Sequence, residues 1–101
     1  MPYIKQEQRD ILDYDIDYLI ARLESVAKND NDLAGVLNYT ITRLAVGSAQ
    51  LKSPKPRYWL INTIVGVLDC VKMELYARVA RPYEDEVCEK NGDLEELKEW
   101  K

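Results

Sequence analysis

Residues 58–81 read YWLINTIVGVLDCVKMELYARVAR, and this stretch decides the fold. In its first half only Asn62, Thr63 and Asp69 are clearly polar. Its main apolar stripe follows the i, i+3, i+4, i+7 spacing of a helix and consists of Ile61, Ile64, Val65, Leu68, Val71, Leu75 and Val79. A helix that is apolar almost all the way round is buried on more than one face. We therefore expect 58–81 to be a central helix on which the rest of the chain packs.

Two amphipathic helices are predicted before this central one. The first covers 13–28 and begins at Asp13, whose carboxylate can accept a hydrogen bond from the free amides of the first turn. The second covers 32–46, and Gly47 is placed as its C-terminal stop. The prolines of the 48–57 segment that follows disfavour helix, which predicts a stiff loop.

The C-terminal part of the chain is predicted to be less regular. Pro82 should end the central helix, because proline breaks a helix interior. Asn91-Gly92 is a turn signal, and Asp93 with Glu96 has the spacing of a capping box. We expect 92–101 to form an acidic tail. The predicted fold is all-α, a small bundle of three main helices with short helical segments at both ends, in one domain over 1–101.

The amino-acid composition limits the kinds of catalytic and metal site that the chain can form. The 101 residues contain seven tyrosines, two tryptophans and no histidine, so the usual general base and the commonest metal ligand are both missing. Cys70 and Cys88 have neither metal-ligand nor redox-motif spacing. We expect both to be reduced thiols of a cytoplasmic protein, without metal, cofactor or membrane-spanning segment. The composition does not identify any small-molecule ligand.

Charge is unevenly distributed around the net value of −4. Residues 1–50 carry five basic and eight acidic side chains, 51–83 carry six and two, and 84–101 carry three and eight. The middle of the chain is therefore basic, and both flanks are acidic. The simplest interpretation is that the flanks pack near the middle and neutralise it.

Two groups of residues are candidate sites. The first is a polar seam along the central helix, with Asn38 added from the preceding helix, and it could hold a small ligand or a metal; its members are Asn38, Asn62, Asp69, Lys72, Glu74, Tyr76 and Arg78. The alternative is a solvated seam in which Asp69 pairs with Lys72 and Glu74 with Arg78.

The second candidate is a basic-aromatic loop, in which cations can meet phosphate and rings can stack on bases of single-stranded nucleic acid; it comprises Lys52, Lys55, Arg57, Tyr58 and Trp59. The alternative is that the two rings close the bottom of the core while the cations face water. The acidic flanks count against a nucleic-acid partner.

Several short pieces of the chain together resemble a known family. They are Pro2-Tyr3-Ile4, Leu37-Asn38-Tyr39 with Thr42, Tyr58 with Ile61-Asn62, Ile64, Gly66 and Leu68, Lys72-x-Glu74-x-Tyr76-x-Arg78, Pro82-Tyr83-Glu84-Asp85 and Asn91-Gly92-Asp93. The family is one of short uncharacterised proteins, carrying a domain of unknown function, from bacteriophage and prokaryote genomes. The resemblance implies an all-helical fold and carries no activity to transfer.

Three functions follow as hypotheses. The first is a self-associating structural or interaction module, most simply a homodimer, since closed twofold symmetry dominates soluble oligomers. The second is a nucleotide-handling enzyme like the MazG-like pyrophosphatases, which bind magnesium through carboxylates a helical turn apart. Such spacings occur among Glu7, Asp10, Asp13 and Asp17. The full set of carboxylates expected of such an enzyme is absent. The third is a nucleic-acid accessory protein that uses the basic-aromatic loop. The balance favours a protein that is not an enzyme.

Overall fold

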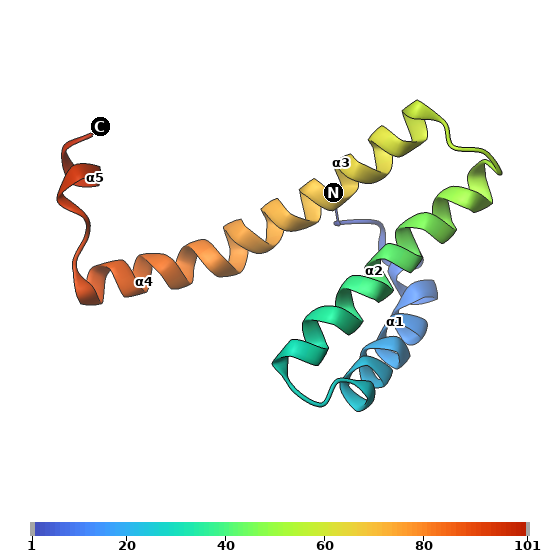
Figure 1. The fold of residues 1–101 in the computed structure, drawn as a ribbon, viewed down its shortest axis with the longest axis horizontal. Helices are drawn as coiled ribbons and strands as arrows, with labels where there is room; N and C mark the ends of the chain where they lie inside the picture. The colour runs from blue at the N-terminus through green and yellow to red at the C-terminus, as the bar shows by residue number, and fades with distance from the viewer. Residues whose placement is uncertain (1, 101) are drawn as a thin grey trace. The chain divides into compact units, whose positions relative to one another are not determined.

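The computed structural model describes residues 2–100, and among these every regular element is a helix (Figure 1). The all-α prediction is confirmed. The elements in chain order are α1 (Gln6–Val26), α2 (Asp30–Lys52), α3 (Tyr58–Leu75), a π turn (Tyr76–Ala80), α4 (Arg81–Asn91) and α5 (Glu95–Glu99).

Helix α1 begins earlier than predicted. Its N-cap is Lys5, whose amide donates to Gln8 Oε1 at 3.2 Å and whose carbonyl accepts from Gln8 N at 3.0 Å. The Arg9 guanidinium donates back to the carbonyl of Ile4 at 2.8 Å. The prediction that Asp13 caps this helix is therefore wrong, because Asp13 lies in its interior.

Helix α2 is capped by Asn29, whose side-chain oxygen accepts from the amide of Asp32 at 2.9 Å. It packs against α1, and the two form an antiparallel hairpin (Figure 1). The predicted stop at Gly47 is wrong, since α2 runs on to Lys52. A glycine ends a helix when it adopts positive φ, and Gly92 is the one described residue that does so, at 95°.

The predicted break at Pro82 is also wrong, because α3, the π turn and α4 follow one another without an interruption. Proline lacks an amide hydrogen, and its ring crowds the carbonyl four residues earlier, here that of Arg78. Within the π turn the chain widens, and Arg81 N–H donates to the carbonyl of Tyr76. We attribute the π turn to this steric conflict, since π turns occur as single widened turns inside α-helices.

The C-terminal segment is ordered into a short helix. Helix α4 ends at Asn91 with Gly92 beyond it, as the turn signal predicts. The prediction of a capping box at Asp93 is wrong, because the N-cap of α5 is Leu94. The Asp93 carboxylate instead accepts a hydrogen bond from the amide of Leu94 at 2.7 Å.

The burial of apolar side chains is the feature that differs most from the sequence-based prediction. Among residues 2–100, Leu60 is the one buried apolar side chain, at 7% exposure. The central stripe that we expected to be covered stays open, with Val65 at 52%, Leu68 at 40% and Val71 at 55%. The chain divides into two compact units, one ending at Val65 and the other beginning at Gly66. The described residues include no helix long and apolar enough to cross a membrane.

Candidate functional site

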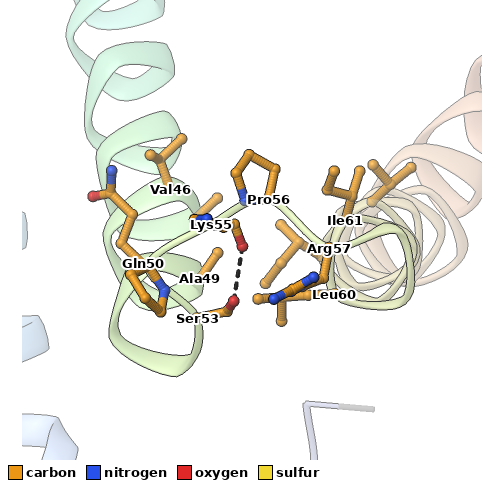
Figure 2. Close-up of a pocket in the computed structure, with 13 residues that line it drawn as sticks. Val46, Ala49, Gln50, Ser53, Lys55, Pro56, Arg57, Leu60 and Ile61 are labelled. Atoms are coloured by element: carbon orange, nitrogen blue, oxygen red, sulfur yellow. Dashed lines mark hydrogen bonds between the residues drawn. The ribbon is translucent and has the colours of Figure 1, made fainter.

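The best-formed concavity belongs to the first unit and lies where α2 turns into α3 (Figure 2). It encloses about 360 Å³, within the range of ligand pockets. Its lining is mostly apolar and consists of Ala45, Val46, Ala49, Gln50, Ser53, Pro54, Lys55, Pro56, Arg57, Leu60, Ile61, Ile64 and Val65. We call it the elbow pocket.

Short-range hydrogen bonds hold the loop that shapes the elbow pocket. Ser53 Oγ donates to the carbonyl of Lys55 at 2.7 Å, the bond drawn in Figure 2, and Ser53 N donates to the carbonyl of Ala49 at 3.0 Å. The carbonyl of Arg57 accepts from the amides of Leu60 and Ile61 at 3.1 and 2.9 Å. Each end of the loop is therefore tied to its helix. The loop is shorter than the predicted 48–57, because α2 continues to Lys52 and leaves 53–57 between the helices. The prolines were visible in the sequence, but the pocket that they border was not predicted.

The basic-aromatic loop is divided by this geometry. Lys55 and Arg57 line the elbow pocket, whereas Lys52 is the last residue of α2. Tyr58 and Trp59 begin α3 and are 80% and 62% exposed. The alternative in which the two rings close the core is therefore wrong. Leu60, the next residue, is the one that becomes buried.

The polar seam is a set of mostly exposed side chains, four of which form two local ion pairs. Lys72 Nζ lies 3.8 Å from Asp69 Oδ1, and Arg78 Nη1 lies 3.7 Å from Glu74 Oε1, so both predicted pairs form. Pairs this exposed contribute at most about 1 kcal/mol.

The two asparagines of the seam are exposed and lie in the first unit. Thr42 Oγ1 donates to the Asn38 carbonyl at 2.8 Å and lies 3.4 Å from its Oδ1. Asn62 lies in the interior of α3. The other five members belong to the second unit. A ligand site in the seam stays a prediction.

A cluster of three polar side chains, which was not predicted from the sequence, lies at the π turn and the start of α4. Arg81 donates through Nε to Asp85 Oδ1 at 2.9 Å, and its Nη2 lies 2.8 Å from the same oxygen. Its Nη1 donates to the Tyr76 hydroxyl at 3.5 Å. The hydrogen bonds with Tyr76 and Asp85 raise the pKa of Arg81 above its ordinary value. The i, i+4 spacing of Arg81 and Asp85 was the available signal.

Both cysteines are free thiols, Cys70 exposed and Cys88 half-buried. Desolvation raises the pKa of Cys88, and the charge of Asp93 with its hydrogen bond raises it further. Cys88 is therefore held in its protonated form to higher pH than an ordinary thiol.

The carboxylates considered for a MazG-like enzyme lie along α1. Asp13 and Asp17 are in the helix interior rather than at its entrance, and Asp10 Oδ1 accepts from Gln6 Nε2 at 2.7 Å. No group of three or more cysteine, aspartate or glutamate side chains suited to a metal ion is found within residues 2–100.

Comparison with known families gives one match. The family model described as "Domain of unknown function (DUF6899)" covers residues 1–94. The chain belongs to the DUF6899 family. Neither the comparison with curated proteins nor the comparison with solved structures finds a match. Membership confirms that the chain carries a domain of unknown function, and it assigns this DUF6899 chain no activity.

Proposed function

We propose that this DUF6899 protein is a self-associating structural or interaction module that works as a homodimer through α3. The observation that carries the proposal is the apolar stripe of α3, which is half-exposed in the single chain while Leu60 alone is buried among the described apolar residues. Exposed apolar patches of a few hundred Å² usually mark interfaces.

The exposed stripe supports this proposal. Its members Val65, Leu68 and Val71 are 52%, 40% and 55% exposed in the single chain. A second copy that laid its own α3 stripe on this one would remove such surface from water at about 25 cal/mol per Å² of apolar area.

Light scattering and sedimentation at micromolar concentration test the dimer. The expected mass is twice the 11.7 kDa of the chain. Val71→Asp places a charge in the stripe and should give a lower mass, while Asn62→Asp adds the same charge on the polar side of α3 and should leave the mass unchanged.

Because Val71→Asp could unfold the chain, Val71→Ala serves as a milder variant and should weaken association with helicity retained. A wild-type monomer with native helicity that persists on concentration contradicts the proposal, and it means that the chain covers its own apolar side chains.

A second candidate, a nucleic-acid accessory protein, is favoured by one observation. The exposed rings of Tyr58 and Trp59 directly follow Arg57, which is the combination that stacks on bases and contacts phosphate. Salt-sensitive retention on single-stranded DNA, lost in a Trp59→Ala variant, is the expected result. No retention at low salt eliminates this candidate.

We further propose a cytoplasmic location and a bacteriophage or prokaryotic origin. The location is supported by the two free thiols, since reduced cysteines are typical of the cytosol. The origin is supported by the resemblance of the sequence alone.

A further inference from the structure

We infer that the elbow pocket receives the C-terminal segment of a second copy, residues 93–100, with Leu97 and Trp100 entering the pocket. This inference rests on the proposed dimer and specifies a contact within it. Leu97 and Trp100 lie beyond the residues 1–94 matched by the family model, so the inference concerns this chain alone.

The segment has apolar side chains without cover. Leu94, Leu97 and Trp100 follow one another at three-residue spacing along α5 and its ends, and they are 62%, 51% and 85% exposed. Leu97 lies within α5, and Leu94 and Trp100 are the caps at its two ends, so the three exposed side chains lie on one short segment. A five-residue helix is too short to be stable alone in water, and docking would supply the packing that it needs.

The elbow pocket is complementary in shape and polarity. Its walls come from apolar side chains such as Val46, Ala49 and Leu60, and Figure 2 shows them facing one another across the turn from α2 to α3. A large aromatic side chain buries about 150–250 Å², and a pocket of about 360 Å³ is of ligand size.

Charge is complementary as well. Lys55 and Arg57 line the pocket, and Lys52 ends α2 at the start of the same loop. The segment carries four acidic side chains, Asp93, Glu95, Glu96 and Glu99, and one basic side chain, Lys98. Lys98 Nζ lies 3.1 Å from Glu95 Oε1. Opposite potentials of this kind orient partners and suppress wrong ones. Because one chain carries both the pocket and the segment, two copies can exchange segments with twofold symmetry.

Tryptophan fluorescence tests the inference. Trp59→Phe leaves Trp100 as the sole tryptophan of the chain. In this background we expect Trp100 emission to move to shorter wavelength, and acrylamide quenching to fall several-fold, as the protein concentration rises through the association range. Ala49→Phe, added to fill the pocket, should abolish both changes. Leu51→Phe, at a position 89% exposed and outside the pocket, is the matched control and should abolish neither.

The outcomes separate this inference from the dimer itself. A dimer by mass whose Trp100 stays fully quenchable overturns the inference and leaves the dimer intact. Protection of Trp100 that survives Ala49→Phe also overturns it, because the segment then docks elsewhere. Protection in a monomer, independent of concentration, means that the segment docks within its own chain and contradicts both proposals. If Ala49→Phe loses helicity, Arg57→Glu replaces it and should reduce the protection by charge repulsion.

Discussion

At the residue scale, Leu60 differs from every other apolar side chain in the described part of the molecule. It sits one residue after two exposed aromatic rings, yet it is 7% exposed and lies in the lining of the elbow pocket. Members of the apolar stripe such as Val65 and Leu68 remain open. Leu60 lies outside that stripe, so periodicity did not identify the side chain that the single chain buries.

Leu60→Ala should destabilise the protein, because removing a buried side chain forfeits transfer free energy and leaves a cavity. We expect a loss of about 2 kcal/mol, the low end for such substitutions, since the pocket beside it is already open. Leu51→Ala is the matched control at 89% exposure and should change stability by less than about 0.5 kcal/mol. Chemical denaturation followed by circular dichroism measures both, and equal effects would contradict the burial of Leu60.

Cys88 should respond to its neighbour Asp93. The carboxylate raises the pKa of the thiol by its charge and by accepting a hydrogen bond from the protonated form. In a Cys70→Ala background, Asp93→Asn should lower the pKa of Cys88, so alkylation by iodoacetamide should begin at lower pH. The folded state favours the thiol, and its contribution to stability is lost as pH rises through the raised pKa. An unchanged alkylation profile would show that Asp93 does not act on the thiol.

At the element scale, the π turn shows how a proline is accommodated inside a long helix. Sequence rules predict a break at Pro82, since the ring removes one hydrogen bond and crowds a carbonyl. The chain instead widens over Tyr76–Ala80 and continues as α4. The Arg81–Asp85 pair lies just after the widened turn and connects two successive turns of α4.

Pro82→Ala should therefore stabilise the chain. Alanine restores the amide and relieves the ring contact, and we expect a gain of about 1 kcal/mol, less than the roughly 3 kcal/mol of a proline in an unrelieved helix. Thermal unfolding at fixed protein concentration measures it. Pro2→Ala, outside any helix, is the control and should have little effect. A lower melting temperature for Pro82→Ala would mean that the π turn has another cause.

At the scale of the whole molecule, stability should depend on protein concentration. If two copies supply the cover that the single chain lacks, folding and association are linked, and dilution favours the unfolded chain. We expect the melting temperature to rise with concentration over the micromolar range, and Val71→Asp to flatten this dependence. A melting temperature that is constant over two decades of dilution would contradict linked folding.

The sequence by itself determined the all-α class, the turn at Asn91-Gly92 and both predicted ion pairs. These features depend on residues within a few positions of each other, and periodicity and spacing record such neighbours directly. Helix ends were predicted less well. Asp13, Gly47 and Asp93 have the composition of caps, but a cap requires non-helical backbone at that position, which composition does not fix.

The tertiary structure alone decided which side chains are covered. The elbow pocket required Ala49 of α2 and Ile61 of α3 to face each other across a five-residue loop. The Arg81 cluster required the π turn to continue the helix past Pro82. Whether a side chain is buried depends on what packs against its segment from elsewhere. The amphipathic pattern therefore predicted that the apolar stripe needs a partner surface. It did not show that the single chain leaves this stripe exposed. That is the physical reason why the helices could be predicted from the sequence and their covering could not.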